Sequence, residues 1–323
     1  MGKIAFIFPG QGSQYVGMGT DFYQHFSSAK KIFDMAGDQI KDLCFNGPQE
    51  LLNITVNAQP CLFAADLASA AALNESGIYA EGAAGFSLGE IPALAYCGFL
   101  SQEEAFALVC LRAQAMQECA QRNKGGMLAV LGLSPEKVTE ICAETSGVWP
   151  ANFNCEDQTV VACAEDNIKQ IQKIFASHGG KSVRLAVSGA FHSPFMDQAE
   201  EKMREYLQSA VFSENTIPLY SNVTAQPYKT AQLCETAQLY KATQFCETAQ
   251  PCETPPKLIA AQVNSPVKWQ KTIENMIADG FDTFIEPGPG KTLSGLVKKI
   301  NQNVRAFPVC DMATLENALR QLV

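Results

Sequence analysis

Hydrophobic positions alternate along the chain between short β-rich runs and longer stretches with helical spacing. Residues 3–8 (KIAFIF) form an apolar run closed by a Pro-Gly pair, which predicts a buried strand that ends in a loop. Helical patterns follow at residues 59–74 and 102–121, with a small, apolar, strand-like run at residues 80–86 between them. This alternation predicts an α/β fold with a mostly parallel, hydrolase-like sheet flanked by helices on both faces.

The pattern changes from Gly126 onward to a compact series of strands and helices. Strands are expected at MLAVLGL, VWPANFN, QTVVAC and residues 182–187, and helices at SPEKVTEICAE, where Ser134 is the cap, and at residues 166–177. The β-α-β-β-α-β order is that of a ferredoxin-like unit. We therefore predict a large α/β domain made of residues 1–124 and 189–323, with a small ferredoxin-like domain, residues 125–188, inserted into it.

Residues 224–253 hold five consecutive hexapeptides, TAQPYK, TAQLCE, TAQLYK, ATQFCE and TAQPCE. A period of six matches no helical stripe, and five copies are too short for a solenoid. We predict a surface insertion within the large domain. Its cysteines, Cys234, Cys246 and Cys252, lack zinc-finger spacing and have no histidine nearby, so no metal site is expected.

Composition narrows the class of protein. The 323 residues are 47% hydrophobic and 18% charged, which fits a globular protein with one large core or two unequal ones. A formal net charge of −9 argues against nucleic acid as a partner. No apolar run of 18 residues occurs, the N-terminus is unlike a signal peptide, and the 12 cysteines are scattered singly. We expect a cytoplasmic monomer with reduced thiols and no membrane contact.

The segment Gly85-Phe86-Ser87-Leu88-Gly89 places one serine between two glycines, directly after the strand-like run. This is the G-x-S-x-G pattern of a nucleophile elbow, in which a sharp strand-to-helix turn exposes the serine Oγ. The helical pattern that follows would direct its N-terminal N–H groups toward a developing oxyanion. Ordinary glycine-bearing loops also contain such pentapeptides.

A serine nucleophile needs a general base, and the chain has three histidines. His25 lies in a polar-aromatic segment typical of a surface helix, and His178 precedes two glycines at a helix C-terminus, a common capping position. His192 follows the point where the small domain returns to the large one, and clefts between domains are where sites are built. His192 is therefore the candidate base, although a hydrogen-bonded structural histidine would also explain it in isolation.

Arg112 interrupts a helical stripe that is otherwise apolar or small. The other positions of that stripe are Ala105, Leu108, Ala115, Met116 and Cys119. A guanidinium there needs an anion. It could extend toward solvent or pair with a nearby glutamate, or it could form a bidentate clamp for a substrate carboxylate.

Taken together, these residues resemble the family of malonyl-CoA:acyl carrier protein transacylases and the acyltransferase domains of fatty acid and polyketide synthases. The resemblance covers nearly the whole chain through six motifs in family order. They are FPGQGSQ (8–14), GFSLGE (85–90), LRAQAMQ (111–117), SGAFHSPFM (188–196), QVNSPVKW (262–269) and EPGPGKTLSGLVKKI (286–300). The combination is far more specific than any single motif.

The resemblance implies a Ser-His dyad. Ser87 would carry the acyl ester, and His192 would act as general base and then as acid. A backbone carbonyl near Gln262 would orient the histidine. The backbone N–H groups of Gln11 and Leu88 would form the oxyanion hole.

The resemblance also implies the substrates. Arg112 matches the arginine that holds the malonyl carboxylate, and Phe191 matches a position associated with malonyl over branched extender units. The family usually has histidine before the nucleophile where this chain has Phe86, which leaves carboxylate recognition more dependent on Arg112. Malonyl-CoA would be the donor and the phosphopantetheine thiol of an acyl carrier protein the acceptor, with no further cofactor. Fatty acid and polyketide synthesis use this same chemistry.

Two other classes of protein are compatible with parts of the pattern. An α/β-hydrolase esterase or thioesterase orders its residues Ser, acid, His with a late histidine, but no histidine follows His192. A non-catalytic subunit that only binds carrier protein would not need Ser87, His192 and Arg112 intact.

Docking of a carrier protein that is acidic in this family requires a local basic patch on an acidic enzyme. The candidate patch consists of Lys268, Lys271, Lys291, Lys298 and Lys299. Lysines at such spacing also occur on ordinary solvated helix faces.

Overall fold

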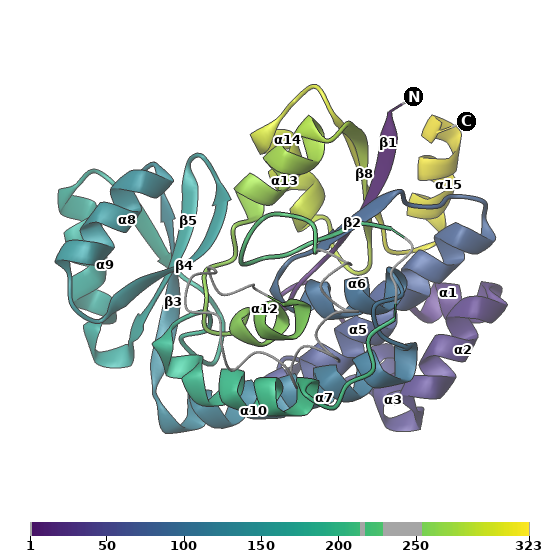
Figure 1. Cartoon of the computed structure of the whole chain (residues 1–323), viewed down its shortest axis with the longest axis horizontal. Coiled ribbons are helices and arrows are strands. Elements are labelled where there is room, and N and C mark those ends of the chain that lie inside the picture. Colours follow the sequence, from purple (N-terminus) through teal and green to yellow (C-terminus); the bar gives the residue numbers. More distant parts are fainter. Residues whose placement is uncertain (1, 214–216, 229–253, 323) are drawn as a thin grey trace, which may run out of the picture.

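The computed structural model describes residues 2–213, 217–228 and 254–322 and contains two separate sheets (Figure 1). One is a five-stranded sheet of order β7-β2-β1-β8-β9, and the other is a four-stranded sheet of order β4-β5-β3-β6. Within the described ranges, no helix is long and apolar enough to cross a membrane. The predicted combination of an α/β sheet with a second, smaller sheet is confirmed.

Every strand pairing in the five-stranded sheet is parallel, as predicted. The strands are β1 (Lys3–Phe8), β2 (Gly82–Gly85), β7 (Leu219–Tyr220), β8 (Phe281–Pro287) and β9 (Arg305–Val309). Since the sheet is parallel, the carboxyl ends of its strands meet at one edge, where ligands bind in open α/β sheets.

Helices cover both faces of this sheet (Figure 1). The core on the first face contains residues of α1 (Thr20–His25), α2 (Ser27–Ala36), α3 (Asp38–Asn46), α4 (Gln49–Leu52), α5 (Thr55–Glu75), α6 (Glu90–Tyr96), α7 (Gln102–Arg122), α10 (Asp197–Leu207), α12 (Pro255–Ala261) and α15 (Met312–Leu322), and the core on the second contains residues of α13 (Trp269–Ala278) and α14 (Thr292–Ile300). Phe6 and Phe8 of β1 belong to the core of the first face, whereas Ala5 and Ile7 belong to that of the second. Burial on both faces explains the continuous apolar run of β1.

The four-stranded sheet has the predicted β-α-β-β-α-β order. Its elements are β3 (Gly125–Leu131), α8 (Pro135–Glu144), β4 (Val148–Cys155), β5 (Gln158–Ala164), α9 (Ile168–Ser177) and β6 (Lys181–Arg184). The pairings are antiparallel, with β3 between β5 and β6. The Ser134 side chain accepts a hydrogen bond from the Lys137 N–H and caps α8, as predicted. The division of the chain into separately folding domains stays a prediction.

Two element boundaries differ from the sequence expectation. The helix expected at 59–74 begins at Thr55, so Pro60 lies inside it rather than near its start, where prolines are usual. The strand expected at 182–187 ends at Arg184, and Leu185 and Val187 beyond it line the pocket described below.

The described start of the repeat, residues 224–228, is partly buried instead of lying wholly on the surface, whereas the insertion as a whole stays a prediction. Ala225 is fully buried, and Tyr228 is only 5% exposed because its ring packs edge-on against Phe99. Pro227 forms a bridge with Tyr220 at the end of the sheet. The rest of the repeat, residues 229–253, lies outside the described residues.

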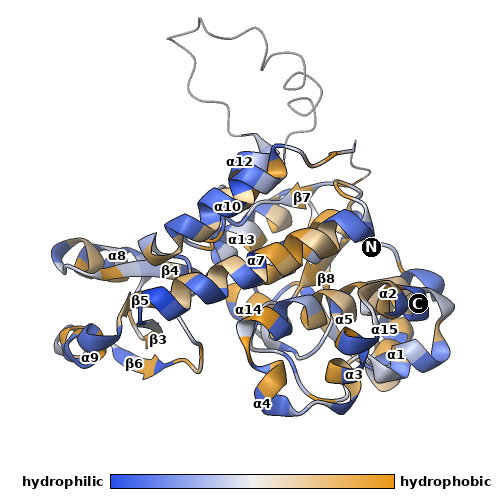
Figure 2. Ribbon diagram, turned by 90° about the horizontal axis from the view of Figure 1, so that it is seen from below, coloured by the Kyte–Doolittle hydropathy of each residue, from blue (hydrophilic) through white to orange (hydrophobic). Residues whose placement is uncertain are grey.

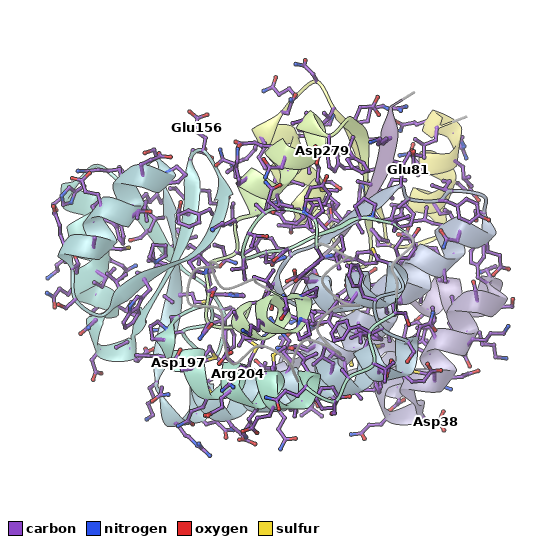
Figure 3. The ribbon with its side chains drawn as sticks, in the orientation of Figure 1. Asp38, Glu81, Glu156, Asp197, Arg204 and Asp279 are labelled. Atoms are coloured by element: carbon purple, nitrogen blue, oxygen red, sulfur yellow. The ribbon has the colours of Figure 1, made fainter. Side chains whose placement is uncertain are left out.

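Charged side chains lie mainly on the outer surface, as Figure 3 shows for Asp38 and Arg204. The outer helix α10 carries both hydrophilic and hydrophobic residues (Figure 2), and it buries Ala199, Met203 and Leu207 at four-residue spacing. The burial of charged groups described next is therefore a departure from the general pattern of the molecule.

Candidate active site

Ser87 lies at the sharp turn between β2 and α6, in the single 3-10 turn η1 (Ser87–Gly89). Its φ of +53° is a left-handed conformation that costs energy for a non-glycine residue and occurs mostly at functional positions. The flanking glycines permit close backbone contacts. A Cβ on Gly89 would lie 2.1 Å from the Phe8 carbonyl oxygen, and one on Gly85 would lie 2.0 Å from the Gly89 carbonyl carbon. This is the backbone geometry of the predicted elbow.

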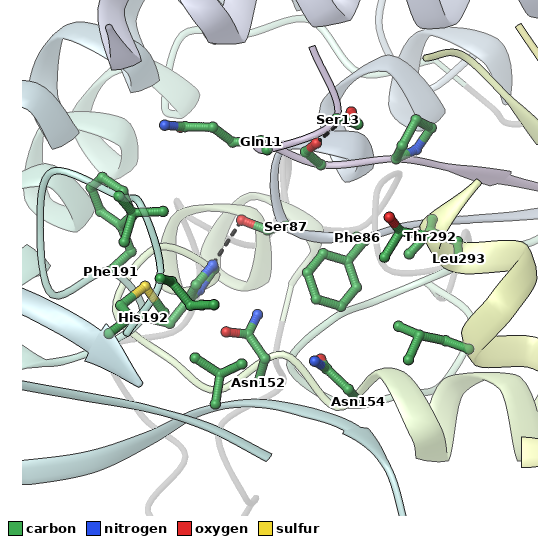
Figure 4. A pocket seen from close by; sticks show the side chains of 18 of the residues that line it. Gln11, Ser13, Phe86, Ser87, Asn152, Asn154, Phe191, His192, Thr292 and Leu293 are labelled. Atoms are coloured by element: carbon green, nitrogen blue, oxygen red, sulfur yellow. Dashed lines mark hydrogen bonds between the residues drawn. The ribbon is translucent and has the colours of Figure 1, made fainter. Parts of the chain in front are cut away.

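His192 faces Ser87 across the pocket, with Nε2 2.7 Å from the Ser87 Oγ (Figure 4). Its Nδ1 lies 2.9 Å from the carbonyl oxygen of Gln262 and 3.1 Å from that of Ser265. Because a carbonyl oxygen can only accept, Nδ1 carries the ring proton and Nε2 is the acceptor for the Ser87 hydroxyl. The two carbonyls thus hold the tautomer that a general base needs, and one of them belongs to Gln262, the residue that the resemblance implied.

The other two histidines are exposed and lie outside the pocket. His25 ends α1, where its Nδ1 is 2.8 Å from the Asp21 carbonyl oxygen. His178 is the C-cap of α9, with its Nδ1 2.9 Å from the Ile174 carbonyl oxygen. His25 thus lies in a surface helix and His178 caps a helix C-terminus, as predicted.

Burial and the nearby Arg112 guanidinium lower the pKa of His192 to about 4. The ring is therefore neutral at neutral pH, as a general base must be. We expect an NMR titration of the His192 ring, assigned with the His192→Ala variant, to show protonation only as the pH falls toward about 4. Titration near the ordinary histidine value of about 6.5 would contradict this account.

Arg112 is 1% exposed and lies beside the Ser87 hydroxyl. One terminal nitrogen donates to the Gln59 Oε1 at 2.8 Å, and the other to the Gln262 Oε1 at 2.8 Å and the Ser87 Oγ at 3.1 Å. Burial lowers the pKa of Arg112 to about 10, so the guanidinium stays charged at neutral pH. Within the described part of the chain, Arg112 forms no ion pair and its Nε has no acceptor. A buried cation with a spare donor is suited to an anionic ligand.

The pocket has a volume of about 280 Å³ and lies between the two sheets. Residues that line it from the small sheet include Met127, Asn152, Asn154 and Val160. Phe86 and Phe191 form apolar parts of its wall (Figure 4), and the Phe86 ring packs edge-on against Trp269 with 5.4 Å between ring centroids. Phe86 therefore offers no polar group where the family usually has histidine.

Two backbone N–H groups were expected to bind an oxyanion. Gln11 lines the pocket, its side chain donates to the Thr55 Oγ1 at 3.2 Å, and its backbone N–H has no acceptor among the described residues. Leu88 is the second residue of η1, and the first N–H groups of a helix have no partner inside the helix. Both groups therefore remain candidates for that role.

The five lysines of the predicted basic patch are exposed on or next to α13 and α14, but three of them have partners. Lys271 pairs with Glu274 at 3.5 Å, Lys299 pairs with Asp157 at 3.6 Å, and Lys298 donates to the Val304 carbonyl oxygen at 2.5 Å. No ion pair within the described ranges involves Lys268 or Lys291. These two lysines, each at the N-cap of a helix, are the better candidates for attracting a partner.

Several residues of the site were missed from sequence. Gln59 holds Arg112, and Asn222 accepts a hydrogen bond from the Ser87 N–H at 2.7 Å through its Oδ1. Glu90 lies within the GFSLGE motif, yet its complete burial was not foreseen. The available signal was a polar residue inside a small or apolar helical stretch, which applies to Gln59 and Glu90 alike.

A serine at a strand-to-helix turn, hydrogen-bonded to a buried histidine, is the arrangement of serine-nucleophile α/β enzymes. The sequence model of the Acyl transferase domain family matches residues 5–316, and the chain belongs to that family. It is 38% identical to malonyl CoA-acyl carrier protein transacylase of Bacillus subtilis (strain 168), over 100% of this chain and 98% of that protein.

Two solved structures resemble the fold closely. Malonyl CoA-acyl carrier protein transacylase from Clostridium perfringens superposes with a TM-score of 0.87 at 36% identity, covering 99% of this chain and 97% of the other. A structure described as a type II PKS acyl-carrier protein in complex with its malonyl-transacylase also gives a TM-score of 0.87, at 30% identity. The match covers 99% of this chain and 99% of the matched chain.

Proposed function

We propose that this acyltransferase moves a malonyl group from malonyl-CoA to the phosphopantetheine thiol of an acyl carrier protein, as a step of fatty acid synthesis. The observation that carries the proposal is the position of the Arg112 guanidinium 3.1 Å from the Ser87 Oγ. A buried cation so close to a nucleophile favours an acyl group that bears its own carboxylate. The names of the relatives agree with this substrate.

The first half-reaction loads the enzyme. The His192 Nε2 takes the proton of the Ser87 hydroxyl while Oγ attacks the thioester carbonyl carbon. The carbon–sulfur bond then breaks, and His192 returns the proton to the departing CoA thiolate. Ser87 is left as a malonyl ester. Negative charge on the carbonyl oxygen in between would be stabilised by the N–H groups of Gln11 and Leu88.

The second half-reaction repeats these steps with the carrier protein. Its phosphopantetheine thiol gives a proton to His192 and attacks the ester carbonyl. The bond to Ser87 breaks, and His192 returns the proton to the serine oxygen. The kinetics are ping-pong, because CoA leaves and Ser87 carries the malonyl ester before the carrier protein reacts, and the proposed steps use no resident cofactor.

Polyketide synthesis is a second candidate pathway, supported by the similarity to a malonyl-transacylase bound to a type II PKS acyl-carrier protein. The chemistry at Ser87 is the same in both pathways.

We also propose that the enzyme is a monomer and that it is cytoplasmic. The free thiols of the nine described cysteines support the second point, because reduced cysteines persist in reducing compartments.

Transfer to a carrier protein tests the proposal. The enzyme is incubated with malonyl-CoA and phosphopantetheinylated acyl carrier protein, and the carrier is followed by intact mass. We expect it to gain one malonyl group at a rate proportional to enzyme concentration. Hydrolysis of malonyl-CoA without gain of mass on the carrier would identify a thioesterase instead.

We propose that the carrier protein approaches over the N-terminal ends of α13 and α14. Lys291 directly precedes Thr292, which lines the pocket, and Lys268 is the N-cap of α13. Attraction between these lysines and an acidic partner would act mainly on the association rate and weaken with salt.

Reversal of both lysines, Lys268→Glu with Lys291→Glu, should raise the KM for carrier protein at low salt and leave acylation by malonyl-CoA unchanged. Glutamate at a helix N-terminus is favoured by the helix dipole, so folding should be preserved. The matched control reverses Lys169 and Lys173, two exposed lysines of α9 in the small sheet's unit. Carrier kinetics unaffected by the first reversal would place the docking surface elsewhere.

A further inference from the structure

Glu90 is a carboxylate at the start of α6 that is completely buried behind the nucleophile. Its Oε1 accepts from the Tyr228 hydroxyl at 2.7 Å and from the Asn222 N–H at 3.0 Å, and its Oε2 accepts from the Gln262 Nε2 at 2.6 Å. Burying a carboxylate costs free energy of folding, so an apolar residue would be more stabilising at a position with only a structural role. None of the chemical steps described above uses this group.

Gln262 connects Glu90 to every reacting group of the site. Its Nε2 also donates to the Ser87 carbonyl oxygen at 2.6 Å, its Oε1 accepts from Arg112 at 2.8 Å, and its backbone carbonyl accepts from His192 at 2.9 Å. In principle the side-chain amide of Gln262 could be turned by half a rotation, which would exchange its oxygen and its NH₂ group and point the NH₂ group at the Arg112 guanidinium.

The Glu90 carboxyl group opposes that alternative orientation together with the Ser87 carbonyl oxygen, which only accepts, and the Arg112 guanidinium, which only donates. A carboxylate only accepts, so the NH₂ of Gln262 must face Glu90 and the amide oxygen must face Arg112. Arg112 is then held by two amide oxygens, those of Gln59 and Gln262, and keeps its Nε donor unused. Glu90 thereby fixes the direction of the guanidinium without touching it.

Tyr228 keeps Glu90 in place from the segment that begins the hexapeptide repeat. Its ring packs edge-on against Phe99 with 5.7 Å between centroids, and its hydroxyl is the only side-chain donor besides Gln262 that Glu90 has within the described residues. Loss of the hydroxyl alone would leave one oxygen of a buried carboxylate short of a donor.

We propose that Glu90 and Tyr228 are positioning residues for acyl selectivity, because they fix the Gln262 amide and through it the Arg112 guanidinium that receives the acyl carboxylate. The inference rests on the proposed function, in which that carboxylate belongs to malonyl-CoA. It assigns a role in substrate choice to a tyrosine of the repeat segment.

The test compares kcat/KM for malonyl-CoA with kcat/KM for acetyl-CoA, measured as ester formation on Ser87. Tyr228→Phe should lower the malonyl to acetyl ratio by roughly 3- to 10-fold, the size of one typical net hydrogen bond, because the loss reaches Arg112 only through Glu90 and Gln262. Glu90→Gln should lower it by at least about tenfold, since the Gln262 NH₂ then loses its charged acceptor and is left with the Ser87 carbonyl oxygen to hold it. Tyr96→Phe is the control, because the Tyr96 hydroxyl is also partly buried but bonds to Asn74 and the Ala80 N–H instead.

A purely electrostatic role for Glu90 predicts the opposite sign. Removing a negative charge near Arg112 would make the site more attractive to an anion and raise the malonyl to acetyl ratio in Glu90→Gln. A raised or unchanged ratio in Glu90→Gln and Tyr228→Phe therefore overturns the proposal, even if both variants melt at lower temperature. If wild-type enzyme forms no malonyl ester at all, the proposed function itself fails, which is a distinct outcome.

Discussion

Replacing His192 by alanine is expected to slow malonyl ester formation by a factor on the order of 10² or more, while Ser87→Ala abolishes it. The Ser87 Oγ lies 2.7 Å from the His192 Nε2, and that ring is held in the accepting tautomer by two carbonyl oxygens. Without the imidazole, the serine hydroxyl must lose its proton to water, and its ordinary pKa is far above neutrality. Rapid-quench kinetics with intact-mass detection would measure both rates.

His178→Ala is the matched control for the histidine variant, because His178 is exposed and its contacts are at the end of α9. It should keep wild-type rates. Full turnover by a folded His192→Ala variant would show that His192 takes no part in the chemistry.

Arg112→Ala is expected to lose activity toward malonyl-CoA by at least about tenfold while activity toward acetyl-CoA is retained or increased. Hydrogen bonds to charged groups contribute about 1.5–3 kcal/mol, and the variant also removes a buried cation that a neutral acyl group leaves unpaired. Steady-state kinetics with both thioesters measure the ratio. Since Phe86 offers no polar group to the acyl carboxylate, Arg112 should account for almost all of the recognition of that carboxylate.

Arg122→Ala serves as the control, because Arg122 ends the same helix α7 and is exposed, with a hydrogen bond to the Gln198 Oε1 at 2.7 Å. It should affect neither thioester. Equal losses for malonyl-CoA and acetyl-CoA in Arg112→Ala would mean that the guanidinium supports the structure of the pocket instead of selecting the acyl group.

Local patterns in the sequence predicted most of the fold because they reflect local physics. The apolar run of β1 is buried on both faces, and the cap of α8 follows from helix-end chemistry. The elbow was visible because two glycines are sterically required around Ser87. The choice among three histidines followed from their neighbours in sequence.

Features that depend on distant partners were not predictable in the same way. Tyr228 was assigned to a surface repeat, since nothing in a hexapeptide reveals that its hydroxyl reaches Glu90, 138 residues away. Lys298 and Lys299 were placed in an open basic patch, but each meets a partner outside its own helix. The burial of Glu90 likewise depends on Asn222, Tyr228 and Gln262, which reach it only in the folded chain.

The most direct test of the central claim is to identify the residue that carries the acyl group. Enzyme incubated with malonyl-CoA, without carrier protein, is quenched, weighed intact and digested for peptide mapping. We predict a mass increase of one malonyl group, located on Ser87, with release of one equivalent of CoA. CoA release without a stable adduct, or an adduct on any other residue, would contradict the account.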